Sequence, residues 1–159
     1  MDHLHTTLRK LSYGGFTVKP SMLYRTAAVL LVLFAVAHTA GFRQADPAWG
    51  ADAVIGSMQS VHFDVQGFSR SYWDFFLGAG FSVGVFFLFS GILAWQLGNL
   101  PATTFASMRV VAWTFTLCFA VVTAVSWRYL FILPVLFGGV ITVCLGAAAW
   151  GSAKPDAAG

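Results

Sequence analysis

The stretch RSYWDFF, residues 70–76, opens an apolar run that continues to Leu97. As an α-helix, residues 72–97 would extend for about 39 Å, which exceeds the roughly 30 Å hydrocarbon core of a bilayer. At its start lie two charged residues, Arg70 and Asp74, and two amphipathic rings, Tyr72 and Trp73. Such residues are typical of the point where a helix enters a membrane. The stretch therefore predicts the polar boundary of a transmembrane helix.

Three further apolar runs, at about 22–42, 104–125 and 129–150, are also long enough to span a bilayer. Of the 159 residues, 58% are hydrophobic and only 9% are charged, and the mean hydropathy is +0.75. Soluble domains carry about 25% charged residues. We therefore predict an all-α protein, a four-helix transmembrane bundle over residues 22–150, and no nucleic-acid partner.

The polar parts of the chain are the tails, 1–21 and 151–159, and one long connection, 43–71. Within this connection, Val54, Met58, Val61 and Val65 recur at helical spacing, which predicts a short amphipathic helix lying in the membrane interface. His62, Asp64 and Gln66 alternate with apolar neighbours, so the helical interpretation beyond Val61 stays open. Gly67 is expected to end any regular secondary structure before Arg70.

The distribution of basic residues predicts the orientation. If both termini are cytoplasmic, six Lys and Arg residues face the cytoplasm and three face outward, in agreement with the positive-inside rule. The inner set is Arg9, Lys10, Lys19, Arg25, Arg109 and Lys154, and the outer set is Arg43, Arg70 and Arg128. The connection 43–71 is then extracytoplasmic.

Small residues at intervals of four predict where the helices pack, because they let two backbones approach closely in lipid. The second run contains a GxxxG pair, and the third and fourth contain similar stripes; the predicted packing residues are Gly80, Gly84, Ala112, Thr116, Ala120, Gly138, Thr142 and Gly146. These stripes would serve packing within the bundle, or assembly with a second copy or a partner membrane protein. Cys118 and Cys144 lie at levels roughly 10 Å apart, too far for a disulfide.

Titratable residues gather at the predicted outer end of the bundle. His38 lies well inside the first apolar run, and an ionisable group within a membrane span is a candidate functional residue. The alternative is a neutral histidine bonded to a backbone carbonyl or a hydroxyl of another helix. His62 and Asp64 could add to a metal set, but their spacing matches no specific pattern, so we predict no metal and no cofactor.

Arg70 and Asp74 are four residues apart and would face the same side of a helix that began by Arg70. One hypothesis is a structural clamp that holds the long connection against the helix. The other is a head-group or quinone site, with Arg70 as donor and Tyr72 and Trp73 as walls.

Several catalytic and transport classes lack support. The sequence contains no P-loop, HExxH or CxxC motif and no nucleophile motif, so no catalytic residue can be assigned. No Asp, Glu, Lys or Arg lies near the middle of a span, which argues against a proton pump or an ion-coupled carrier.

The segment from Met58 to Leu97 resembles an uncharacterised bacterial family of small four-span inner-membrane proteins that carry an RSYWDF motif. The residues that carry the resemblance are Met58, Phe63, Gly67, Arg70 to Phe75, Gly78, Gly80 and Leu93 to Leu97. It implies a four-span fold in the bacterial inner (cytoplasmic) membrane, and no established activity. A looser similarity to DoxX-like membrane proteins concerns only the number of spans.

From the sequence, the leading hypothesis is a non-enzymatic helical bundle that associates with lipid or with partner proteins. The alternative is a small membrane enzyme or a quinone- or lipid-binding protein. Its site would lie at the outer corner, formed by His38, His62, Asp64, Arg70 and Asp74.

Overall fold

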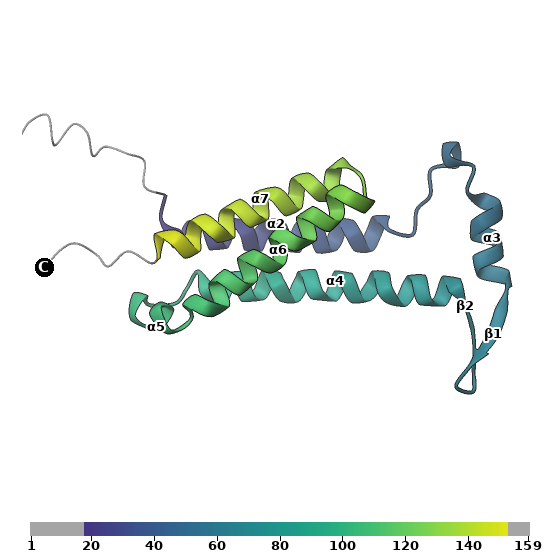
Figure 1. Ribbon diagram of the computed structural model, residues 1–159, viewed down its shortest axis with the longest axis horizontal. Helices are drawn as coiled ribbons and strands as arrows, with labels where there is room; N and C mark the ends of the chain where they lie inside the picture. Colours follow the sequence, from purple (N-terminus) through teal and green to yellow (C-terminus); the bar gives the residue numbers. More distant parts are fainter. Residues whose placement is uncertain (1–17, 153–159) are drawn as a thin grey trace, which may run out of the picture.

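The computed structural model describes residues 18–152 (Figure 1). Four of its helices are long and apolar enough to cross a membrane: α2 (Pro20–Gly41), α4 (Tyr72–Leu97), α6 (Arg109–Tyr129) and α7 (Ile132–Gly151). The chain is therefore a multi-pass membrane protein with a mostly helical fold. Nearly all of the tails predicted at 1–21 and 151–159, with Arg9, Lys10 and Lys154, lies outside the described residues.

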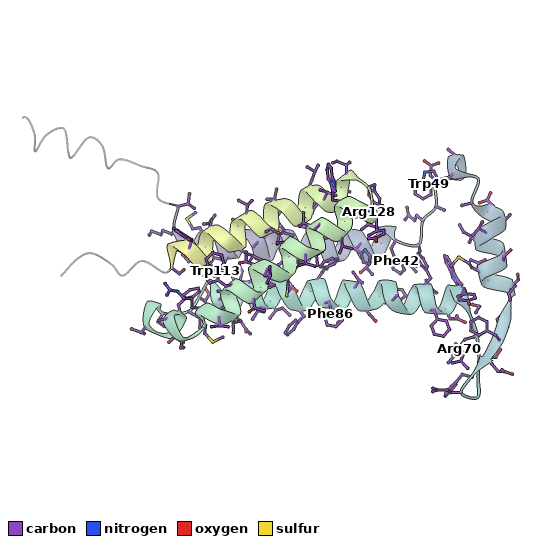
Figure 2. All side chains as sticks on the ribbon, viewed as in Figure 1. Phe42, Trp49, Arg70, Phe86, Trp113 and Arg128 are labelled. Atoms are coloured by element: carbon purple, nitrogen blue, oxygen red, sulfur yellow. The ribbon has the colours of Figure 1, made fainter. Side chains whose placement is uncertain are left out.

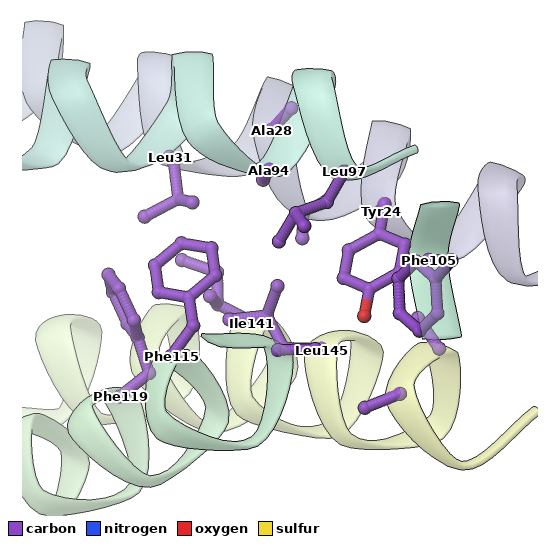
Figure 3. Close-up of a cluster of buried hydrophobic side chains, with 14 residues drawn as sticks. Tyr24, Ala28, Leu31, Ala94, Leu97, Phe105, Phe115, Phe119, Ile141 and Leu145 are labelled. Carbon is purple, nitrogen blue, oxygen red and sulfur yellow. The ribbon is translucent and has the colours of Figure 1, made fainter. Parts of the chain in front are cut away.

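The four long helices form two layers. α2 packs against α4 in one layer and against α7 of the other, and α7 packs against α6. Between the layers lies a core of buried apolar side chains (Figure 3). Tyr24 and Leu31 of α2 project into it from one side, and Ile141 and Leu145 of α7 project from the other.

Glycines of α4 form the surface on which α2 lies. A Cβ atom at Gly84 would lie 2.5 Å from Oγ1 of Thr39, and one at Gly80 would overlap the ring of Phe42. Further along α4, a Cβ at Gly91 would meet the carbonyl oxygen of Ala28 at 3.3 Å. The glycines thus allow α2 and α4 to approach more closely than larger residues would permit.

Small residues also line the contact between α6 and α7. Gly138 faces Thr123, and Gly146 faces the methyl group of Thr116. The hydroxyl oxygens of Thr123 and Thr142 lie 3.3 Å apart, and each hydroxyl also donates a hydrogen bond within its own helix, to the carbonyls of Phe119 and Gly138. Of the α6 stripe, Ala112 and Thr116 are buried and Ala120 is half-buried. The small-residue stripes therefore lie at contacts within a single chain.

The bounds of the second span agree with the sequence prediction, but those of the third and fourth lie further along the chain. A separate short helix, α5 (Ala102–Ser107), precedes α6, and its Phe105 is buried against Tyr24. Residues 126–128, which separate the predicted third and fourth runs, do not form the turn that this division implies: they continue α6, and the carbonyl of Ser126 accepts the cap bond from Leu130. None of these three residues breaks a helix, so composition alone misplaced the boundary.

The long connection contains η1 (Pro47–Trp49), α3 (Asp52–Ser60) and an antiparallel β-hairpin that the all-α prediction did not include. Strands β1 (His62–Val65) and β2 (Phe68–Ser71) are joined by two residues with positive φ, Gln66 at 52° and Gly67 at 84°. This is the pattern of a type I′ hairpin turn. Val65 is therefore a strand residue, which answers the question left open beyond Val61: α3 ends at Ser60, and the chain continues as a strand.

Candidate functional site at the hairpin end

The first turn of α4 is held by a capping box. The Ser71 hydroxyl oxygen accepts a hydrogen bond from the backbone N–H of Asp74 at 3.3 Å, and a carboxylate oxygen of Asp74 accepts from the Ser71 N–H at 2.8 Å. The Ser71 hydroxyl also lies 3.1 Å from that carboxylate oxygen. Asp74 thus satisfies backbone donors that a helix N-terminus would otherwise leave unpaired.

Arg70 does not share a helix face with Asp74, because it lies in β2 and α4 begins at Tyr72. Its guanidinium donates a hydrogen bond to the Ser69 carbonyl at 2.8 Å and lies over the Phe68 ring, 5.2 Å from the ring centroid. Among residues 18–152, Arg70 and Asp74 form no direct hydrogen bond or ion pair with each other, although the positive charge of Arg70 favours the charged carboxylate. The direct polar contact at the start of α4 is therefore the capping box of Ser71 and Asp74, not that pair.

Strand pairing sorts the hairpin residues onto two faces. Phe63 stands opposite Arg70 and Val65 opposite Phe68, and opposite residues project from the same side of a sheet. This apolar face, Phe63, Val65, Phe68 and Arg70, contacts α4 where Phe63 packs on Tyr72 and Phe75, at ring-centroid distances of 5.0 and 6.0 Å. The opposite, polar face consists of His62, Asp64, Ser69 and Ser71.

His38 is engaged in a contact between helices. Its Nε2 lies 3.0 Å from the carbonyl oxygen of Gly80 on α4, and its ring stacks on Phe42 with centroids 5.3 Å apart. Phe87 of α4 approaches the same ring edge-on at 5.9 Å. The contact with the Gly80 carbonyl fits the alternative of a neutral histidine bonded to a backbone carbonyl of another helix.

His38 does not meet the other predicted site residues. His62 pairs with Ser71 just before α4 begins, whereas His38 contacts Gly80, nine residues further along, which corresponds to about 13 Å of helical rise. His62 Nδ1 lies 3.0 Å from the Ser60 carbonyl, and Asp64 is exposed to the surroundings. Among residues 18–152, no three His, Cys, Asp or Glu side chains are grouped closely enough to hold a metal ion.

Aromatic rings connect the hairpin end to the bundle. Phe42, just after α2, packs against Phe76 and Phe81 of α4 at 5.6 and 5.3 Å, and Trp73 stacks on Phe76. The Arg43 guanidinium lies over the rings of Phe42 and Phe81. These contacts join the end of α2 to the first turns of α4, although Phe76 and Phe81 remain 39% and 42% exposed.

An open hollow of about 330 Å³ lies elsewhere, along a single face of α6. Its lining is Arg109, Val110, Trp113, Thr114 and Leu117, from the end of α6 that is remote from the hairpin. It includes none of the predicted site residues.

The common face of Phe63 and Phe68 was not predicted from the sequence. Their signal was the alternation of polar and apolar residues from 62 to 65, followed by a residue pair ending in glycine, which is typical of a hairpin.

Comparison with models of known protein families, with curated proteins and with solved structures finds no match for the chain. The resemblance to the RSYWDF family therefore stays a prediction.

Proposed function

We propose that the protein is a non-enzymatic, lipid-associating helical bundle. The main support for this proposal is that the polar groups near the hairpin end make structural contacts with neighbouring parts of the chain. Asp74 caps α4, His38 bonds a carbonyl of α4, and Arg70 bonds its own strand. Each of these groups serves local structure, and His38 lies at a different level of α4 from the other two, so the three do not form a set that could act together on one substrate.

The apolar surface of the bundle supports the lipid part of the proposal. Only 11% of the most apolar window of α4 is buried within the chain, and Phe86, labelled in Figure 2, is 68% exposed. An apolar surface of this extent is suited to acyl chains, since it would be costly in water.

We further propose that the protein lies in the bacterial inner membrane with both termini in the cytoplasm and α3 at the outer surface. The location rests on the resemblance of the RSYWDF segment. The orientation rests on the six-to-three distribution of basic residues between the two sides. The contact of Gly151 with Pro20 agrees with termini on one side, because it joins the end of α7 to the start of α2.

The test is native mass spectrometry of protein purified in mild detergent from bacterial membranes, with lipid identification. We expect bound phospholipids of more than one head-group class, retained by His38→Gln and by a surface control, Val143→Ala. A quinone or other small lipophilic compound bound in a fixed ratio and lost in His38→Gln would overturn the proposal in favour of a site. A protein partner that remains bound as phospholipid is removed would overturn the lipid assignment.

A further inference from the structure

Within residues 18–152, the apolar face of the hairpin is covered at its base, near α4. Phe63 packs on the first turn of the helix, but Phe68, towards the tip, is 60% exposed, and Arg70 is exposed beside it. Outside a membrane, an exposed Phe beside half-buried Val65 would leave apolar surface in water. The polar face on the other side, formed by His62, Asp64, Ser69 and Ser71, presents no large apolar side chain. The two faces of the hairpin therefore suit different surroundings.

The position of the hairpin brings this face to the bilayer surface. The hairpin lies across the end of α4, and its tip projects past the side of α4 that faces away from α2 (Figure 1). α4 extends eight residues beyond its contact with His38, whereas α2 ends three residues beyond it. At 1.5 Å per residue, the first turn of α4 thus projects roughly 7 Å past the end of α2, towards the level of the lipid head groups.

Because Phe63 packs sideways onto α4, the face that it shares with Phe68 and Arg70 is turned back towards the helix. Figure 2 shows Arg70 on this side of the hairpin. If α4 spans a bilayer, the surroundings on that side, beyond α4 itself, are the lipids that contact the exposed side of the helix. The occupant that the geometry favours is therefore the bilayer, not a soluble protein.

We propose that the hairpin docks on the bilayer through its apolar face and that Arg70 binds the phosphate groups of anionic phospholipids there. Aromatic and aliphatic side chains such as Phe68 and Val65 enter the boundary between head groups and acyl chains. A guanidinium has five N–H donors, and the contacts described for Arg70 use one of them. Arginine pairs with phosphate through two parallel hydrogen bonds, so the remaining donors suit a lipid phosphate. This inference rests on the proposed lipid association and specifies one surface for it.

The test compares adjacent residues on opposite faces. Asp64→Cys and Val65→Cys, each in a Cys118→Ala/Cys144→Ala background, keep Phe68 and Arg70 intact. Each variant carries a nitroxide label and is reconstituted into vesicles of phosphatidylcholine with or without phosphatidylglycerol. Oxygen reports lipid exposure and a water-soluble nickel chelate reports aqueous exposure. We expect the label at 65 to favour oxygen and the label at 64 to favour the chelate.

Adding Arg70→Gln tests the phosphate contact. A basic residue at an anionic surface changes binding by about five-fold. We therefore expect phosphatidylglycerol to increase the ratio of docked to undocked hairpin by about that factor with Arg70 and to have no effect with Arg70→Gln, while Arg70→Lys keeps most of the response.

Equal aqueous exposure of labels 64 and 65 in both vesicles would overturn docking, and an unchanged lipid response in Arg70→Gln would overturn the role of Arg70. Protection of label 65 from both reagents would indicate a protein partner and overturn lipid as the occupant. Each result can arise while phospholipid still co-purifies with the bundle, so failure of this inference is distinguishable from failure of the proposed function.

Discussion

At Gly84 the absence of a side chain lets α2 lie directly against α4. A Cβ there would meet Oγ1 of Thr39 at 2.5 Å, whereas Gly78, six residues earlier on the same helix, has no atom within 4 Å of its Cβ position. The two glycines therefore form a matched pair for testing the contact between the helices.

We expect Gly84→Leu to lower the free energy of unfolding by about 1–3 kcal/mol through overpacking, and Gly78→Leu to have little effect. Thermal unfolding in detergent, followed by circular dichroism, measures both. Equal melting temperatures for the two variants would show that α2 and α4 do not approach each other at Gly84.

Tyr24 makes an unusual contribution to the core. Its side chain is 1% exposed and packs on Phe105, but within residues 18–152 its hydroxyl is buried without a hydrogen-bond partner (Figure 3). A buried polar group in this state costs about 1–3 kcal/mol.

Tyr24→Phe removes that hydroxyl and keeps the ring, so we expect stability to be higher by about 1–3 kcal/mol. Tyr24→Ala removes the ring as well and should cost about 3–5 kcal/mol. Thermal unfolding measures both; a clear loss of stability in Tyr24→Phe would mean that the hydroxyl does have a partner.

At the scale of elements, the start of α4 depends on its capping box. Ser71→Ala removes the hydroxyl that accepts from the Asp74 N–H, and loss of such a cap typically costs about 1 kcal/mol. A double-mutant cycle measures how strongly two side chains are coupled. We expect Ser71→Ala and Asp74→Asn to be strongly coupled in thermal unfolding.

The same cycle for Arg70→Ala and Asp74→Asn distinguishes the capping box from the clamp predicted from sequence. We expect weak coupling, because Arg70 bonds its own strand and stacks on Phe68. Coupling as strong as that between Ser71 and Asp74 would restore the Arg70–Asp74 clamp.

The hairpin depends on its turn. Gly67 has φ of 84°, a conformation in which a Cβ is strained, although the space around it is open. We expect Gly67→Val to destabilise the hairpin by at least 1 kcal/mol and to accelerate hydrogen exchange of amides 62–71 about five-fold or more. Exchange in α4 should be unchanged; Gly56→Ala, an open position without positive φ in α3, serves as the control.

At the scale of the whole molecule, the proposed orientation makes a direct prediction. Alkaline phosphatase fused after residue 159 should be inactive and green fluorescent protein there should fluoresce, because both termini are proposed to be cytoplasmic. Phosphatase inserted after Gly50, between η1 and α3, should be active. The reverse pattern of activities would invert the proposed topology.

Much of the architecture follows from properties that are local in the sequence. The apolar runs predict four long helices because each satisfies its own backbone hydrogen bonds, as a membrane requires. The run from Tyr72 to Leu97 is bounded by polar residues at one end and a glycine turn at the other, and its predicted bounds agree with α4. The third span has weaker boundary signals, so its predicted bounds were misplaced.

The candidate site could not be assembled from sequence spacing. Arg70 and Asp74 would meet only if both were helical, and the hairpin turn at Gln66 and Gly67 places Arg70 in a strand instead. His38 lies far in sequence from Gly80, and a contact between them depends on how α2 packs on α4.

The sequence by itself thus determined the four apolar helices and the class of protein, because transfer into lipid depends on the composition of each segment alone. The tertiary structure decided the roles of individual polar residues. The capping box of Ser71 and Asp74, the bond of His38 to α4 and the two-faced hairpin all depend on which atoms are brought within hydrogen-bond or contact distance, and this follows from packing. Residues 70–76 therefore belong to two elements, the end of strand β2 and the first turn of helix α4, which join at Ser71.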